Sequence, residues 1–252
     1  GETRSGLYYD GLRILKHKMP KYSIIENVKN LTSEKFRPIF HQILCDLEDA
    51  GYHSYYEVLN AKDYGIPQNR ERVFIISIRK DIDQGFMFPL PFDNGLRLKD
   101  LLEDEVDEKY YISQRKLVNF ALYHKASKDF NECVLYGNLN HYGNDQMNRV
   151  YSFEGIAPTM TAVSGSGREQ KIISPFNRRI REIIPLEYFR LMGFDDTDYW
   201  LCKNAGISDS QLYKMAGNSI VVQVLEGILG NLLKSGAEVP DCFYGEQMNL
   251  FG

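Results

Sequence analysis

The chain has 252 residues, of which 43% are hydrophobic and 25% are charged, and its formal net charge is −4. This length suffices for one large domain or two small ones, and the negative charge argues against binding nucleic acid by overall electrostatics alone. Four cysteines without CxxC spacing argue against a metal site or a disulfide framework. Because no secretion signal and no run of about 18 apolar residues occur, we expect no membrane partner and a cytoplasmic location.

The first third of the chain alternates between helical and strand patterns. Apolar residues at helical spacing end at Pro20 and again at Gly51. A nearly continuous apolar run over residues 73–78 follows Arg70 and Arg72. The predicted elements are a helix over residues 8–19, a strand over 22–25, a helix over 36–47, and strands over 52–59 and 73–78. A continuous apolar strand requires cover on both faces, so this part is predicted to be an α/β fold.

The pattern changes in residues 86–177, where glycines, prolines and short β-prone runs predominate. We expect a smaller, irregular, β-rich domain with strands near residues 133–136, 149–153 and 159–163 and one helix over 114–123. Residues 100–108 hold six acids and no base, whereas residues 168–181 hold five bases and one acid. That basic cluster is either a local binding face or a solvated charge cluster. Helices return at 186–192 and 219–233.

Two polar motifs flank these strands. Glu26 ends the apolar run of the 22–25 strand, where ligand sites of open sheets lie, and partial burial there favours its protonated form. Arg70 and Arg72 are two residues apart, so in an extended strand both side chains project from the same face. Backbone amides could instead satisfy Glu26, and the arginines could pair with surface acids.

A third motif, Gly217, Asn218 and Ser219, is predicted to open the last helix, with Ser219 as its N-cap. The alternative is a plain turn and cap. The segment around Arg181, Glu187 and Arg190 is interpreted as structural, with these residues bracing the joint between the two domains.

In their order, the Glu-Asn-Val, Gln-Asn-Arg-Glu-Arg, Arg-Leu-Met-Gly-Phe and Gly-Asn-Ser motifs resemble the DNA cytosine C5-methyltransferases. The resemblance runs from about Arg4 to Leu233. It implies an α/β fold: part of a doubly wound, S-adenosylmethionine-dependent methyltransferase sheet plus a smaller recognition domain. By resemblance, residues 1–85 and 178–252 belong to the catalytic domain, and residues 86–177 form the target recognition domain.

The resemblance also implies a role for each matched residue. Glu26 takes the position that contacts N3 of a flipped cytosine, and Arg72, with Arg70 beside it, the position at the cytosine O2. Asn218 and Ser219 correspond to part of the S-adenosylmethionine pocket. The expected contacts to double-stranded DNA are Arg4, Thr159 and Met160, the last two standing in place of the usual Thr-Leu pair.

The family's Gly-rich cofactor loop and its Pro-Cys nucleophile have no counterpart in this sequence. We therefore expect the C-terminal portion of a bacterial or phage DNA (cytosine-5-)-methyltransferase, of the restriction-modification type, that is inactive without an N-terminal half. The 22–25 strand should then have an unpaired edge. Alternatives are a catalytically silent DNA-binding fragment that uses residues 86–177, and an unrelated α/β nucleotide-binding enzyme.

Overall fold

The computed structural model describes residues 6–123, 129–163, 165 and 167–234. They form two compact units, between which the chain crosses several times. Unit 1 takes in the described residues of Gly1–Leu59, Glu71–Leu90 and Glu226–Gly252, and unit 2 those of Asn60–Arg70 and Pro91–Leu225. The segment expected to be the recognition domain, residues 86–177, thus lies almost wholly in unit 2, together with residues 178–225 that were assigned to the catalytic domain.

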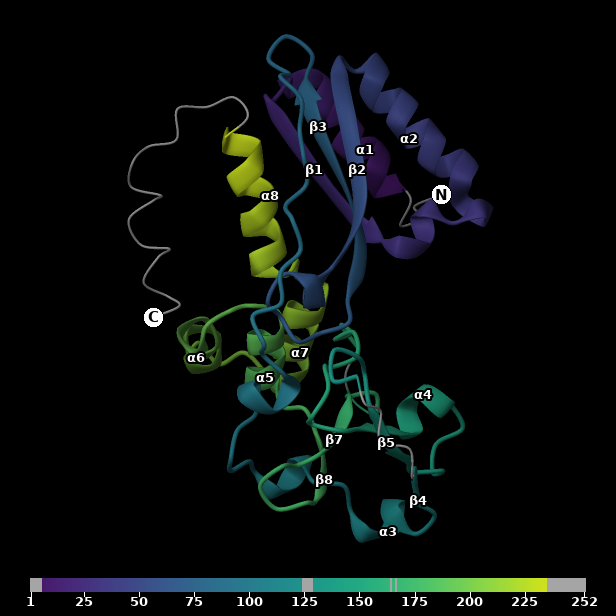
Figure 1. The fold of residues 1–252 in the computed structure, drawn as a ribbon, viewed down its shortest axis with the longest axis vertical. Coiled ribbons are helices and arrows are strands. Elements are labelled where there is room, and N and C mark those ends of the chain that lie inside the picture. Colours follow the sequence, from purple (N-terminus) through teal and green to yellow (C-terminus); the bar gives the residue numbers. More distant parts are fainter. Residues whose placement is uncertain (1–5, 124–128, 164, 166, 235–252) are drawn as a thin grey trace. The chain divides into compact units, whose positions relative to one another are not determined.

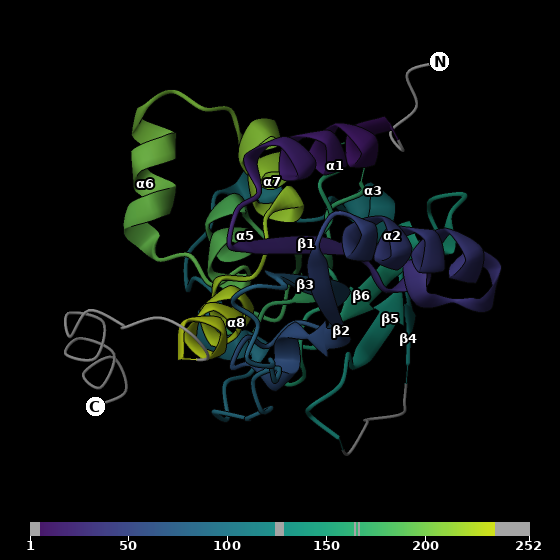
Figure 2. The same ribbon diagram turned by 90° about the horizontal axis from the view of Figure 1, so that it is seen from above.

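Unit 1 is built on a three-stranded sheet with helices on both faces (Figures 1 and 2). Its elements are α1 (Gly6–Lys18), β1 (Tyr22–Val28), η1 (Lys29–Thr32), η2 (Glu34–Phe36), α2 (Arg37–Asp49), β2 (Tyr52–Asn60), β3 (Glu71–Arg79) and part of α8 (Val222–Lys234). The strand order is β1-β3-β2, and β1 runs antiparallel to β3. Among the described residues β1 is therefore an edge strand.

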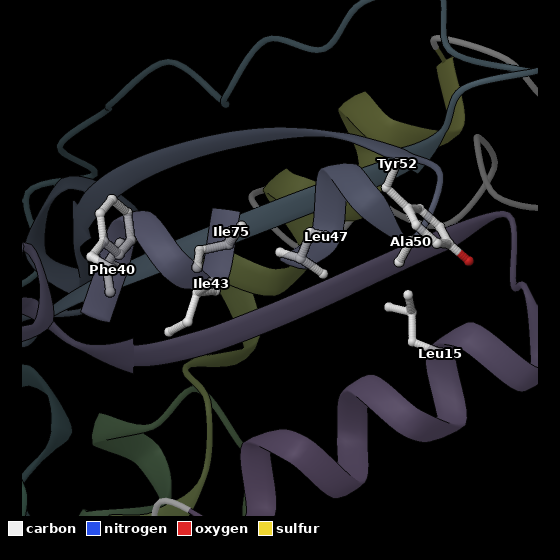
Figure 3. Close-up of a cluster of buried hydrophobic side chains, with 8 residues drawn as sticks. Leu15, Phe40, Ile43, Leu47, Ala50, Tyr52 and Ile75 are labelled. Carbon is white, nitrogen blue, oxygen red and sulfur yellow. The ribbon is translucent and has the colours of Figure 1, made fainter. Parts of the chain in front are cut away.

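The core of unit 1 lies between the sheet and helices α1 and α2 (Figure 3). The amphipathic spacing of the two helices places their apolar side chains on the sheet. The buried cluster consists of Leu15, Phe40, Ile43, Leu47, Ala50, Tyr52, Val73 and Ile75. In β3 the alternate residues Phe74, Ile76 and Ile78 are also buried, so both faces of this strand are covered, as its continuous apolar sequence predicts.

Helix α8 lies on the face of the sheet opposite α1 and α2 (Figures 1 and 2). Ile228 and Leu232 lie on its buried stripe, and Gly227 packs against Pro89 at a distance that leaves little room for a side chain. The Asn231 side chain donates to the Met87 carbonyl (3.1 Å). These contacts fix the end of the helix in unit 1.

Strand β1 is longer than the sequence predicted. It continues through Glu26 and Asn27 to Val28, which lies opposite Arg72, whereas the prediction ended it at residue 25. The main-chain pairing with β3 continues regardless of side-chain polarity. Glu26 is therefore a residue within a strand, not one just past its end.

Unit 2 contains a five-stranded sheet of short strands and a group of helices. Its elements are η3 (Ala61–Asp63), η4 (Leu98–Leu101), η5 (Glu108–Tyr110), α3 (Gln114–Leu117), β4 (Ala121–Leu122), β5 (Leu135–Asn138), α4 (Asp145–Asn148), β6 (Arg149–Tyr151), β7 (Lys171–Ile173), β8 (Ile180–Glu182), α5 (Pro185–Leu191), α6 (Asp196–Asn204) and α7 (Asp209–Asn218). The sheet order is β4-β5-β6-β7-β8, with only β6 and β7 parallel among these pairs.

Several predicted elements of unit 2 were wrong in extent or kind. The helix predicted over 114–123 is the four-residue α3, followed by β4. Residues 159–163 form no strand, because the main-chain N–H and carbonyl of Met160 bond to the side chains of Gln68 and Arg70. Helices α6 and α7 were not predicted.

The end of unit 2 differs from the prediction at the Gly-Asn-Ser motif. Gly217 and Asn218 close α7, Ser219 follows in an extended conformation, and α8 begins only at Val222. Ser219 is thus not the N-cap of the last helix. By length and composition alone, the stretch Asp209–Lys234 could cross a membrane, and no other described stretch could; the break after Asn218 divides it into α7 and α8.

A buried ion pair braces unit 2. Arg181 and Glu187 have fully buried side chains and form a two-pronged contact of 2.7 and 2.8 Å. The Glu187 carboxylate also accepts the main-chain N–H groups of Glu103 and Ile184 (2.9 Å each). The two residues are structural, as interpreted from the sequence, but the expected location is corrected: this ion pair lies inside unit 2 and not at a joint between domains.

Candidate active site

A carboxylate and a guanidinium meet on one face of the unit 1 sheet. Arg72 Nε lies 3.0 Å from Glu26 Oε1, and both side chains are about four-fifths buried (18% and 23% exposed). The register explains the contact: Glu26 lies opposite Phe74, and Arg72 is two residues before Phe74, so all three share a face. The sequence predicted a carboxyl group that favours its protonated form, whereas the structure shows an ion-paired one.

Another nitrogen of the Arg72 guanidinium and the side chains of neighbouring residues also form hydrogen bonds. Arg72 Nη1 donates to the Glu71 carbonyl (2.8 Å), and the Glu71 carboxylate accepts from Lys29 Nζ (2.6 Å). Asn27 is exposed and its side-chain oxygen accepts the Val28 N–H (2.8 Å). The Glu26–Arg72 pair therefore has a fixed geometry at one end of β1.

Arg70 differs from Arg72 in position and contacts. It precedes β3, is only 4% exposed, and belongs to unit 2. Its guanidinium donates to the carbonyl oxygens of Met160 (2.9 Å), Gly217 (3.1 Å) and Ser219 (2.9 Å). The expectation that Arg70 and Arg72 project together from one strand face is thus corrected, because the strand begins between them.

The side chains of Gln68 and Asn60, which the sequence analysis did not predict as site residues, add to the hydrogen bonds around Arg70. The buried Gln68 side chain donates to the Leu191 carbonyl (2.6 Å) and accepts the Met160 N–H (2.9 Å). Asn60 accepts the Arg70 N–H through its side chain (2.9 Å). The signal was present in the glutamine of the Gln-Asn-Arg-Glu-Arg motif, whose amide can serve two main-chain partners at once.

The predicted DNA contacts Thr159 and Met160 differ in how far their side chains are exposed. The Thr159 hydroxyl is partly exposed and donates to the Asn69 carbonyl (2.6 Å). The Met160 side chain is completely buried, so a direct DNA contact through it is corrected to a core position. Arg4 lies outside the described residues.

The Gly-Asn-Ser motif offers polar atoms for part of a cofactor site. Asn218 is exposed, and the half-buried Ser219 donates its hydroxyl to the Ile220 carbonyl (3.2 Å). Gly217 passes so close to the main chain of Thr161 and Ala162 that a side chain there would collide with it. The exposed amide of Asn218 beside this turn fits one edge of a polar ligand such as S-adenosylmethionine. Asn218 and Ser219 would form only this edge of the cofactor pocket.

The predicted site residues thus fall into two groups. Glu26 and Arg72 come together in unit 1, and Arg70 joins the segments of Met160 and Ser219 in unit 2. The convergence of both groups on one cleft stays a prediction. No group of three or more His, Cys, Asp or Glu side chains suited to a metal ion occurs among the described residues.

Comparison with known proteins identifies the family. The profile of the C-5 cytosine-specific DNA methylases matches residues 1–234. The chain belongs to this family. Such DNA methylases use S-adenosylmethionine as the methyl donor.

Similar DNA methylases come from bacteria and phages. The orphan methyltransferase M.SPBetaI of Bacillus phage SPbeta is 31% identical, with 92% of this chain and 70% of that protein covered. The type II methyltransferase M2.ScrFI of Lactococcus lactis subsp. cremoris is 36% identical (92% and 60% covered), and M.HhaI of Haemophilus parahaemolyticus is 34% identical (92% and 68%). The chain spans 60 to 70% of the length of these three methylases.

Solved structures show the same methylase fold. The S. pombe Dnmt2 methyltransferase matches with a TM-score of 0.67 at 21% identity, covering 93% of this chain and 72% of that one. The Entamoeba histolytica methyltransferase EhMeth matches with a TM-score of 0.64 at 17% identity, covering 90% and 68%. The predicted α/β methyltransferase fold is confirmed.

Proposed function

We propose that this chain is the C-terminal portion of a DNA (cytosine-5-)-methyltransferase of the restriction-modification or phage type, working in the cytoplasm on double-stranded DNA. The observation that carries the proposal is the Glu26–Arg72 pair of 3.0 Å on the sheet, in a chain of this family. The reaction replaces the hydrogen at C5 of a cytosine turned out of the helix with a methyl group, and loss of the C5 proton releases the thiolate that was transiently bonded to C6. S-adenosylmethionine supplies that methyl group when bound.

In this proposal Glu26 and Arg72 act together on the pyrimidine ring. Attack of a thiolate on C6 places negative charge on the ring, and the charge is shared by N3 and O2. Glu26 holds a proton at N3, and the Arg72 guanidinium donates hydrogen bonds to O2. In the free chain the ion pair keeps both side chains in place. When the cytosine binds, its N3 and O2 replace the ion-pair contact as the partners of Glu26 and Arg72.

Arg70 is a positioning residue in this proposal. Its three carbonyl acceptors belong to the Met160 segment and to the turn at Gly217 and Ser219. By holding that turn, Arg70 sets the position of Asn218, whose exposed amide is proposed to contact S-adenosylmethionine. Thr159 remains the proposed DNA contact of its segment.

The thiolate and the rest of the cofactor pocket have to come from an N-terminal half. Two features of unit 1 offer it a surface. β1 pairs only with β3 among the described residues, so its other edge has main-chain groups for a further strand. On α1, Leu7 and Ile14 are seven residues apart and more than half exposed, which leaves an apolar stripe uncovered.

The test is reconstitution. The chain should show no methyl transfer alone and should become active when coexpressed with a polypeptide that carries a Gly-rich loop and a Pro-Cys motif. In the reconstituted enzyme Glu26→Gln should lower kcat by roughly 10²–10⁴-fold and change DNA affinity little. Glu71→Gln, which makes the same change in the exposed Lys29–Glu71 pair, is the matched control and should stay active.

Methyl transfer by the chain alone would show that it is not a partial enzyme. DNA binding without activity in every reconstituted mixture would support the alternative, a catalytically silent DNA-binding fragment.

A further inference from the structure

A buried ammonium group lies in unit 2, outside the site described above. Lys171, the first residue of β7, is only 1% exposed. Its Nζ donates to the carbonyl oxygens of Gly167 (2.6 Å) and Glu169 (2.8 Å) and lies 5.4 Å from the centre of the Tyr142 ring. A buried lysine is costly unless its donors are satisfied, and here two carbonyls and an aromatic face surround it.

These hydrogen bonds join the side chain of Lys171 to main-chain carbonyls of the turn Gly167–Lys171, in which it is the last residue. Gly167 has φ +82° and sits against Tyr142, where a side chain would collide with the ring. The Glu169 carboxylate accepts the Gly165 N–H, and the Gln170 N–H is directed at the Tyr188 hydroxyl (3.4 Å). The turn is therefore held from inside by polar groups, with little apolar packing of its own.

Arg168 is the residue that this turn exposes. Its main-chain N–H bonds to the Gly165 carbonyl (3.3 Å), and its side chain is exposed, with no hydrogen bond or ion pair to a described residue. The next residue but one, Gln170, is directed at the Thr159 carbonyl (3.4 Å), so the turn adjoins the segment that Gln68 and Arg70 hold. An exposed guanidinium on an ordered turn is suited to a DNA phosphate.

We propose that Lys171 is a positioning residue for DNA binding, whose buried ammonium fixes the Gly167–Lys171 turn and thereby the contact of Arg168 with DNA. The inference rests on the proposed DNA methyltransferase function. It assigns a role to two members of the basic 168–181 cluster: Lys171, which like Arg181 is buried, positions the turn, and the exposed Arg168 presents the charge.

The groups around Lys171 make this contact dependent on pH. Burial lowers the pKa of Lys171 to about 8, against the opposing effect of Glu182 and Glu169, while Lys116 also lowers it. Glu182 lies directly opposite on β8, and burial raises its pKa to about 7. The ammonium is thus present below pH 8 and lost above it, and the turn should loosen as the pH rises through that value.

The test is a double-mutant cycle in the reconstituted enzyme, with sheared mixed-sequence duplex DNA as the probe. Arg168→Gln should reduce the slope of log affinity against log salt by about 1, as loss of one phosphate contact requires. Lys171→Met should reduce this slope by a similar amount, and the double variant should show no further reduction of the slope. Arg115→Gln, another exposed arginine of unit 2, should add its own effect to that of Lys171→Met.

Two further measurements keep the outcome decisive. Wild-type affinity should fall severalfold between pH 7 and pH 9, and less in Lys171→Met. In the free chain, hydrogen exchange of the Arg168 and Gln170 amides should be faster in Lys171→Met, whatever the enzymatic activity.

Unchanged exchange at Arg168 and Gln170 would overturn the positioning role even if the methyltransferase proposal holds. Additive losses for Arg168→Gln and Lys171→Met would overturn the link between the two residues. Absence of DNA binding by the reconstituted wild-type enzyme would contradict the proposed function itself.

Discussion

Arg70 and Arg72, two residues apart in the sequence, have different structural surroundings. Arg72 is in β3 and pairs with Glu26, whereas Arg70 precedes the strand and donates to three carbonyl oxygens. Both were expected to face the substrate. The same kind of side chain therefore forms an ion pair on the sheet of unit 1 at one position and holds a turn of unit 2 at the other.

The first prediction separates the two arginines. Arg70→Lys removes the fork that reaches three acceptors and leaves buried carbonyl groups without donors, so it should lower the free energy of unfolding by about 2–4 kcal/mol. Arg72→Lys should change stability by less than about 1 kcal/mol while lowering kcat in the reconstituted enzyme. Urea unfolding and turnover measurements on both variants check this, and equal stability losses would refute it.

The second prediction concerns Glu187. Glu187→Gln leaves the fully buried Arg181 without its charge partner, and such a loss typically costs about 3–5 kcal/mol. Denaturant unfolding measures it. The control is Glu108→Gln, which removes an exposed partner of Arg179 and should hardly move the unfolding midpoint. A similar small shift for both variants would show that burial of the Arg181 pair does not matter.

At the scale of elements, one carboxylate joins three segments of unit 2. Asp209, at the start of α7, accepts from Lys109 and Tyr110 of η5 (2.8 and 2.9 Å) and from Lys203 of α6 (2.6 Å). Burial raises the pKa of Asp209, but the hydrogen bonds from Lys109, Lys203 and Tyr110 outweigh it and hold the pKa well below its usual range. These helices are short, so such links contribute to their placement.

The third prediction follows from the sign of that shift. A carboxylate whose pKa is lower in the folded state stabilises the fold above its unfolded pKa of about 4 and loses the contribution as the pH falls. Asp209→Asn should therefore lower stability at pH 7 by about 1–2 kcal/mol, with the difference shrinking below pH 4. Thermal unfolding of both proteins across this range checks it. A difference that stays constant down to pH 2 would contradict the linkage.

At the scale of the whole molecule, the sheet of unit 1 ends at β1 as far as the described residues go. No described strand pairs with the outer edge of β1, and Leu7 and Ile14 on α1 are more than half exposed, so both features invite association.

The fourth prediction is that the purified 29.2 kDa chain forms oligomers or aggregates alone and a defined complex with an N-terminal half. Light scattering measures the masses, and hydrogen exchange should show new protection in β1 within the complex. A dispersed monomer that gains no protection at β1 on mixing would mean that the edge needs no partner.

Much of unit 1 could be predicted from the sequence alone. Helical spacing before Pro20 and Gly51, and the apolar run of β3, report local properties that do not depend on distant residues. The family motifs likewise predicted Glu26 and Arg72 as site residues, a role that stays a prediction, and the structure brings their side chains into contact.

Only the tertiary structure decided how those residues are used. Main-chain register extended β1 past Glu26 and set it beside Arg72, while carbonyl groups from distant segments buried Arg70. In unit 2 the strands are two to four residues long, too short for a periodic signal, so β7 could not be predicted. Helices α6 and α7 have nine and ten residues and were missed although Asp195 and Ser208 cap them, a signal that the sequence does contain. Local patterns determine local structure, and the partner of a buried polar group comes from elsewhere in the chain.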